Sequence, residues 1–183
     1  MPGGRAKGTN TLYFVRRDEI PPHRRRDIAH AKVVCNVRPQ KEETNRVRLT
    51  FAGQNVNSGM DNGTPTADLI TVKLLLNSII STEGARFMGI DIKNFYLNTP
   101  MDRPEYLRMK IDNFPDDVID HYNLREKVDD KGYVVTRVEK GMYGLPHAGI
   151  IAQRLLEKRL GDAGYRQSTV TPGFWKHDNR PIC

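Results

Sequence analysis

The chain has 183 residues, of which 38% are hydrophobic and 28% charged, so it can fold as one domain with a sizeable core and is too apolar for complete disorder. The whole net charge of +7 lies in the first 50 residues, which hold 12 Lys and Arg against 5 Asp and Glu, whereas the remaining residues hold 17 of each kind. Such a basic segment suits a polyanion such as nucleic acid, although basic termini also occur on proteins that bind no anion.

Cysteine content and hydropathy narrow the class further. Cys35 and Cys183 cannot build a disulfide framework or a zinc site by themselves, and Cys35 is predicted to be a small buried residue because it lies in an apolar run. No stretch approaches the roughly 20 apolar residues of a membrane helix, and residues 1–9 are predicted to be a disordered basic tail rather than a secretory signal. These features predict an intracellular protein, cytoplasmic or nuclear, with no membrane partner, and they leave the oligomeric state open.

Alternation of apolar and polar residues predicts strands in the first 51 residues. A short strand is expected at residues 12–15, and longer ones at 31–38 and 46–51. In the last of these, Arg46 and Arg48 share one face, so the strands predict an antiparallel sheet with a basic side. A solvated surface is the ordinary explanation of two such arginines, and the alternation alone does not exclude it.

A helix is predicted after the polar loop at residues 53–63. Thr64 can cap it, Pro65 suits its first turn, and Asp68 lies near the positive end of its dipole. Apolar residues recur at helical spacing and predict that most of this helix is buried; they are Leu69, Val72, Leu76, Ile79 and Ile80.

The stretch from Arg86 to Asn98 begins as a short apolar run, which predicts a buried strand. Asp91 interrupts the run, and an unpaired carboxylate in such a place costs several kcal/mol, so it needs a partner. Backbone amides at the strand end are one partner. A divalent cation is the other, and Tyr96, five residues later, would then shape a nucleotide pocket beside it.

The second half of the chain continues with alternating elements. The pattern predicts strands at 105–111, 133–138 and 173–177, a short acidic helix at 116–124, a turn at 129–132, and a long helix at 150–162 that Gly164 terminates.

Three segments, in this order and spacing, resemble the reverse transcriptase domain of copia-type retrotransposons. Residues 64–76 are similar to the helix before the first catalytic motif of that family. Asp91-Ile-Lys-Asn-Phe-Tyr-Leu-Asn98 is similar to the signature Asp-Val-Lys-Thr-Ala-Phe-Leu-Asn, and Gly141-Met-Tyr-Gly-Leu-Pro-His-Ala148 to Ser-Leu-Tyr-Gly-Leu-Lys-Gln-Ala. The resemblance covers residues 10–183.

The resemblance implies an α+β, right-hand polymerase fold. It implies an antiparallel fingers sheet, formed by residues 10–63 and 102–146, and an incomplete palm with two packed helices, formed by residues 64–101 and 147–183. The implied activity is RNA-directed DNA polymerisation by two-metal nucleotidyl transfer, with an RNA or DNA template-primer and deoxynucleoside triphosphates as partners and Mg²⁺ as cofactor.

The resemblance also implies the site residues. Asp91 matches the first catalytic carboxylate and Mg²⁺ ligand, and the backbone carbonyl of Ile92 adds a further ligand. The nucleotide-binding residues are Arg46 and Arg48 for the triphosphate, with Arg48 favoured, Tyr96 as the ring that excludes a ribose 2′-hydroxyl, and Pro146, His147 and Ala148 beneath the base.

Two departures from the family affect the expected activity. His147 stands where the family has Gln, and the strand–turn–strand with two further aspartates is missing. We therefore expect these 183 residues to be part of a polymerase, to bind Mg²⁺ weakly or not at all, and to be inactive in polymerisation.

Two other functions are compatible with the sequence. The first is a non-catalytic, nucleic-acid-binding remnant of a retroelement, which keeps the basic sheet. The second is an unrelated enzyme in which Asp91 does acid–base work, but His121, His147 and His177 have no Ser or Cys at a recognisable spacing.

Overall fold

The computed structural model describes residues 8–42, 44–52, 63–64 and 66–181. The strands are β1 (Leu12–Val15), β2 (Ala29–Val37), β3 (Asn45–Phe51), β4 (Pro100–Lys110), β5 (Tyr133–Lys140), β6 (Tyr165–Gln167) and β7 (Trp175–His177). The α-helices are α1 (Leu69–Ser81), α2 (Asp116–His121) and α3 (Ala148–Asp162), and the short 3-10 helices are η1 (Arg17–Glu19), η2 (Pro22–Asp27), η4 (Ile111–Asn113) and η5 (Leu124–Glu126). The chain is thus of mixed α/β class.

Five strands form one curled sheet in the order β1-β5-β4-β2-β3, and β6 pairs with β7 in a separate hairpin. The β2–β3 and β4–β5 hairpins are antiparallel, but β2 and β4 pair in parallel, with Ala29 opposite Leu107 and His30 opposite Arg108. The prediction of an antiparallel sheet is therefore wrong at this pair. β2 pairs with β3, β4 pairs with β5, and these two antiparallel pairs meet along β2 and β4, which run in the same direction.

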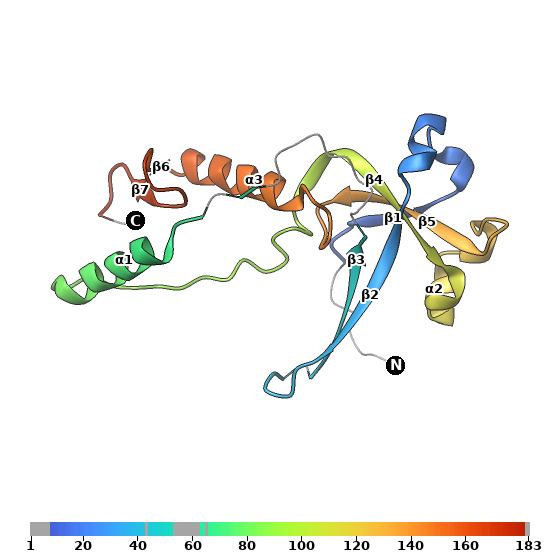
Figure 1. Cartoon of the computed structure of the whole chain (residues 1–183), viewed down its shortest axis with the longest axis horizontal. Helices are drawn as coiled ribbons and strands as arrows, with labels where there is room; N and C mark the ends of the chain where they lie inside the picture. The colour runs from blue at the N-terminus through green and yellow to red at the C-terminus, as the bar shows by residue number, and fades with distance from the viewer. Residues whose placement is uncertain (1–7, 43, 53–62, 65, 182–183) are drawn as a thin grey trace.

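The molecule is elongated (Figure 1). The five-stranded sheet lies at one end, and the β2–β3 hairpin projects from it as an arm. Helix α3 leads from the sheet toward the opposite end, where α1 and the β6–β7 hairpin lie. The two ends thus offer separate surfaces.

The largest core cluster joins the sheet to the loop before α3. It contains Ala29, Phe51, Met101, Leu107, Val138, Met142, Leu145 and Ala148. Beside it, the buried carboxylate of Glu105 accepts a 2.6 Å bond from Arg24, whose guanidinium also lies 5.5 Å from the centre of the Tyr106 ring. A buried charge is tolerated only with such a partner, so this pair fixes η2 against β4.

Gly144 lets the loop before α3 reach β3. The Phe51 N–H donates to the Tyr143 carbonyl at 2.7 Å, and Gly144 has φ +89°, which favours glycine. A Cβ at this position would lie 2.1 Å from the Phe51 carbonyl oxygen, so no larger residue fits without moving the strand or the loop.

Most predicted elements of the sheet are confirmed. The strands expected at 12–15, 31–38, 46–51, 105–111 and 133–138 are β1 to β5, the helices expected at 116–124 and 150–162 are α2 and α3, and the strand expected at 173–177 is the shorter β7. The chain turns between Asp129 and Gly132, as expected, and Gly164 follows α3 with φ +87°.

The predictions for the first long helix are wrong in two respects. It begins at Leu69 rather than after Thr64, because Asp68 has extended backbone and its carboxylate accepts the Thr71 N–H at 2.6 Å, which makes Asp68 the N-cap. This bond also lowers the pKa of Asp68. In addition, no residue of α1 is buried, so α1 and α3 are not the two packed helices that the sequence predicted.

The buried strand predicted around Asp91 is also absent. Residues 86–92 are extended, form no strand, and are exposed. Their apolar side chains, like those of α1, are largely exposed, although Ile92 lies beside Leu155 and Leu156 of α3. The exposed apolar side chains of the two segments are Leu69, Ile70, Val72, Leu74, Leu76, Ile80, Phe87, Met88, Ile90 and Ile92.

Smaller corrections concern the N-terminal half. Cys35 is exposed rather than buried, because it lies on the projecting β2–β3 arm. Within the tail predicted to be disordered, residues 1–7 lie outside the described residues, but Thr9 is placed: its carbonyl accepts a bond from Lys140. The loop predicted at 53–63 lies outside the described residues except for Gly63. Among the helices that are described, none combines the length and apolar character needed to cross a membrane.

We expect Gly144→Ala to destabilise the fold by about 2 kcal/mol or more, because the added methyl group collides with the Phe51 backbone and the positive φ is strained for alanine. Urea unfolding measures this loss. Gly161→Ala is the matched control, since a Cβ there meets nothing within 4 Å and alanine favours the helix. Equal stability of the two variants would contradict the role of Gly144.

We expect the chain to self-associate through α1 and residues 86–92, because these two segments carry many exposed apolar side chains and burial of apolar surface favours association. Light scattering over a concentration series measures the mean mass. Ile70→Gln with Leu74→Gln should lower the association, whereas Val170→Gln, a change at a single exposed residue outside these segments, should not. A concentration-independent monomer mass for the parent would refute this expectation.

Candidate functional site

A pocket of about 450 Å³ lies where separate parts of the chain meet. The residues before β1, strand β3, the turn after Asp91 and the loop before α3 all contribute to its walls. Its polar side chains come from Thr9, Asn10, Arg46, Arg48, Asn94 and Tyr143, among others. The structure therefore brings both arginines predicted for nucleotide binding to one concave site.

Arg48 is held in this pocket by Tyr143. The Arg48 guanidinium carbon lies 5.4 Å from the centre of the Tyr143 ring, a cation–π contact. Arg48 Nε is buried and has no hydrogen-bond partner among the described residues. An unsatisfied buried donor costs about 1–3 kcal/mol, so this N–H is suited to an acceptor that enters the pocket.

Tyr96 contacts the pocket through Tyr143. The two rings meet edge to face, with centroids 5.5 Å apart and an interplanar angle of 82°. Arg48, Tyr143 and Tyr96 thus form a stack that joins β3, the loop before α3 and the turn after Asp91. Tyr96 is half-buried against the main core cluster and stands behind Tyr143 rather than in the pocket wall.

The turn that carries Tyr96 is fixed by its own hydrogen bonds. Asn94 has φ +55°, a value that asparagine tolerates, and its carbonyl accepts the Asn98 N–H at 3.0 Å. The Thr99 hydroxyl donates to the Phe95 carbonyl at 2.8 Å, and the Gly141 N–H donates to the Thr99 carbonyl at 2.9 Å. These bonds attach the turn to the end of β5, next to Tyr143.

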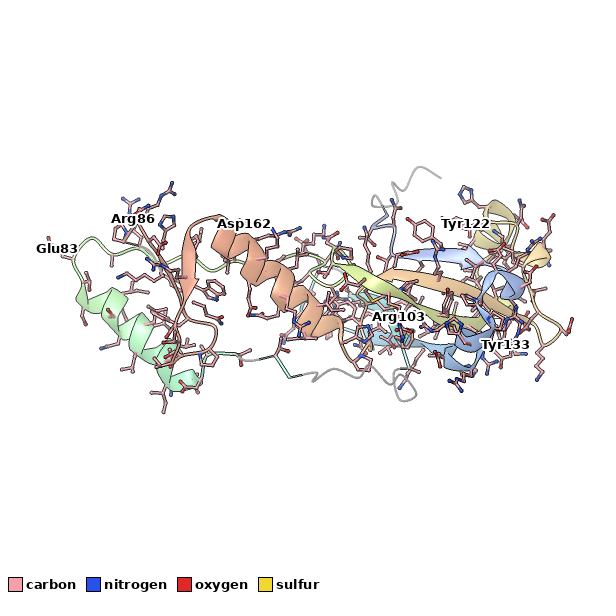
Figure 2. The ribbon with its side chains drawn as sticks, turned by 90° about the horizontal axis from the view of Figure 1, so that it is seen from above. Glu83, Arg86, Arg103, Tyr122, Tyr133 and Asp162 are labelled. Carbon is pink, nitrogen blue, oxygen red and sulfur yellow. The ribbon has the colours of Figure 1, made fainter. Side chains whose placement is uncertain are left out.

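His147 lines a different pocket. This cavity, of about 270 Å³, lies between the start of β4 and the first turns of α3, and Arg103 (labelled in Figure 2) and Glu105 also line it. His147 is 4% exposed, and its Nδ1 has no hydrogen-bond partner among the described residues. Burial lowers the pKa of His147, with Glu105 opposing the shift and Arg103 adding to it, so the imidazole is neutral near pH 7.

The neighbours of His147 have structural positions. Ala148 belongs to the main core cluster, and Pro146 is half-buried in the loop before α3. Neither residue lines the pocket that contains the two arginines. The six residues predicted for nucleotide binding are therefore divided between the arginine pocket, its supporting stack and the base of α3.

Asp91 and Ile92 lie apart from the pocket walls, in the exposed extended segment. The Ile92 side chain lines a small cavity beside Leu155 and Leu156 of α3. No three His, Cys, Asp or Glu side chains gather to hold a metal ion within the part of the chain that is described. Asp91 and the Ile92 carbonyl supply two oxygen donors, which suit Mg²⁺ only where water and substrate phosphates complete the coordination.

Sequence reasoning missed Tyr143 as a functional residue. It lies inside the quoted Gly-Met-Tyr-Gly segment, but its ring reaches Arg48 through a contact between segments that are almost 100 residues apart in the chain. Gly8 and Thr9 belong to the predicted tail and instead line the pocket. No periodicity marks either feature, because both depend on contacts between segments far apart in the chain.

Comparison with known proteins identifies no relative: no family model, no curated protein and no solved structure matches the chain.

We expect the chain to lose stability below about pH 6.5, partly through His147, because its unfolded form takes up a proton there that the buried imidazole does not. The melting temperature at pH 7.5 and pH 5.5 measures this loss. His147→Gln should reduce the difference between the two temperatures, whereas His121→Gln, at an exposed position, should not. The same difference in both variants and the parent would show that His147 does not contribute.

Proposed function

We propose that this chain is the nucleotide-binding part of an RNA-directed DNA polymerase, the copia-type reverse transcriptase that its sequence resembles. The observation that supports this most is the stack of Arg48, Tyr143 and Tyr96 beside a pocket that also contains Arg46. Two arginines without carboxylate partners, in the described part of the chain, suit a ligand that carries several negative charges.

The triphosphate of a deoxynucleotide is that ligand. Arg48 can donate its buried Nε–H and its remaining guanidinium N–H groups to phosphate oxygens, and Arg46 adds a second positive charge at the same pocket. Tyr143 orients the Arg48 guanidinium, and Tyr96 orients Tyr143. In this proposal the two rings limit the space beside the sugar, so that a ribose 2′-hydroxyl is disfavoured.

Asp91 and the Ile92 carbonyl would hold Mg²⁺ together with the phosphates of the bound nucleotide. When bound, Mg²⁺ neutralises phosphate charge and activates the primer hydroxyl. Asp91 is exposed, so its carboxylate is accessible from solvent. Asp91 also precedes Asn94, which lines the pocket, by only three residues. In this proposal that short connection limits how far the carboxylate can lie from the bound nucleotide.

The second candidate function is a non-catalytic protein that binds nucleic acid. One observation favours it: the described residues bring no three metal-ligating side chains together, and two-metal catalysis needs several carboxylates. We therefore expect nucleotide binding without nucleotide incorporation from these 183 residues. Nucleotide binding that depends on Arg48 separates the polymerase proposal from this alternative, which requires only nucleic-acid binding.

The decisive test is the affinity for a fluorescent dATP analogue in the presence of Mg²⁺, measured by anisotropy. Loss of a charge-assisted hydrogen bond costs about 1.5–3 kcal/mol, so Arg48→Gln should weaken binding about 10- to 100-fold. Arg86→Gln removes the same charge at the opposite end of the molecule (Figure 2) and should leave the affinity unchanged. Equal affinities of the two variants would overturn the proposal.

The same assay with the ribonucleotide analogue tests the two rings. The parent should prefer the deoxynucleotide, and Tyr96→Ala should reduce this preference, because Tyr143 loses the ring that holds it in place. Tyr165→Ala removes a ring that packs on His177, away from the pocket, and serves as the control. An unchanged preference in Tyr96→Ala would remove Tyr96 from sugar selection.

A further inference from the structure

Two basic side chains of β4 lie against one aromatic ring of β5. The Arg108 guanidinium carbon is 4.9 Å and the Lys110 ammonium 4.3 Å from the centre of the Tyr133 ring. The His30 ring also contacts Tyr133, at 5.8 Å between centroids. We call His30, Arg108, Lys110 and Tyr133 the Tyr133 cluster. Tyr133 marks the end of the molecule farthest from Arg86 in Figure 2.

Arg108 is fixed in position before any ligand binds. Its Nε and Nη2 lie 3.2 and 2.8 Å from His30 Nε2, which accepts from the guanidinium. Because the guanidinium is held by His30 on one side and by Tyr133 on another, little side-chain entropy remains to be lost when an anion binds.

In the described part of the chain, the two cations of the cluster are bound by a ring nitrogen and a carbonyl oxygen rather than by carboxylates. Neither Arg108 nor Lys110 forms an ion pair with a carboxylate of the described chain; the Lys110 ammonium instead donates to the Lys131 carbonyl. The hydrogen bonds to His30 leave Arg108 with unused N–H donors. Two positioned cations without a carboxylate are an anion site of the kind that phosphate groups occupy.

The nearby acidic residues do not cancel this charge. A cavity of about 270 Å³ beside Arg108 is lined by Arg17, Asp129, Asp130 and Lys131. Asp129 is already used, because it accepts the N–H groups of Lys131 and Tyr133 at 3.0 and 2.9 Å and pairs with Arg17 at 3.5 Å. The cavity wall has three basic residues, counting Arg108, against Asp129 and Asp130, and Lys110 adds a fourth, so the net charge around the cavity is positive.

We propose that the Tyr133 cluster binds the phosphate groups of a single-stranded nucleic acid, as a contact separate from the arginine pocket. The two sites share no lining residue. Arg108 and Lys110 are two residues apart on β4, so their Cα atoms are about 6.8 Å apart and both side chains leave the same face of the strand. The choice of nucleic acid as partner rests on the proposed function.

The contacts of the cluster determine its sequence specificity. Arg108 and Lys110 both lie over the Tyr133 ring, so this ring contacts two cations in the absence of a ligand. Contacts to phosphate alone carry no sequence information. The cluster therefore binds strands of any sequence, and its contribution decreases with salt as counterions compete for the phosphates.

The test is fluorescence anisotropy of a labelled 20-nucleotide oligo-dT at 50 and 150 mM salt. Arg108→Gln with Lys110→Gln should weaken binding about tenfold at 50 mM and lower the slope of log affinity against log salt by about 1.4, or 0.7 for each lost contact. Lys73→Gln with Arg86→Gln is the matched control, since it removes the same two charge types at the other end of the molecule.

If Arg108 is needed for folding, the single variant Lys110→Gln still tests the proposal, because Lys110 is exposed. Lys110→Gln should lower the slope of log affinity against log salt by about 0.7. Equal binding by the parent and the Arg108/Lys110 variant, or no binding by the parent at 50 mM, overturns the inference. Stronger binding of poly-glutamate than of oligo-dT also overturns it, in favour of an acidic protein partner. The dATP analogue should bind the Arg108/Lys110 variant and the parent equally. A negative result with oligo-dT can therefore be told apart from a failure of the proposed nucleotide binding.

Discussion

The seating of the loop before α3 on the end of β3 determines the arrangement of the rest of the molecule. One backbone hydrogen bond, from Phe51 to Tyr143, and one residue without a Cβ, Gly144, allow this contact. The contact places the Tyr143 ring over Arg48 and closes the main core cluster around Phe51. It also sets the direction in which α3 leaves the sheet, and hence the elongated shape (Figure 1).

Two further interactions fix other segments to the sheet and its loops. The bond between Gly141 and Thr99 attaches the turn after Asp91 to the same loop, which brings Tyr96 to Tyr143. Elsewhere on the sheet, the buried pair of Arg24 and Glu105 holds η2 against β4, with the Arg24 guanidinium over Tyr106. The arginine pocket thus depends on backbone contacts at one end of β4, and the position of η2 depends on a buried charge pair.

The sequence predicted the local elements of the sheet well and their surroundings poorly. Alternation located β2 to β5, because a strand with one buried face has a period of two wherever it lies. The same reasoning predicted that α1 and residues 86–92 are buried, since apolar residues at helical or strand spacing need a covering surface. Periodicity shows that a face is apolar but does not show which element packs on it. In the described part of the chain, Ile70, Ile80 and Ile90 are exposed. Among the candidate site residues, Arg46 and Arg48 share a pocket, but Tyr143, His30 and Arg108 could not be chosen without the contacts between strands.

The chain has a net charge of +7, and its arginines differ in whether the fold neutralises them. Some arginines are neutralised inside the fold, as Arg24 is by Glu105 and Asp27, and these contribute to stability rather than to recognition. Others, namely Arg48 and Arg108, lie against tyrosine rings and have no carboxylate partner within the described residues. A tyrosine holds a guanidinium in place without neutralising it, whereas a carboxylate does both. Arg48 and Arg108, each beside a tyrosine ring and without a carboxylate partner in the described residues, are therefore positions where the fold keeps positive charge both ordered and available to an anion.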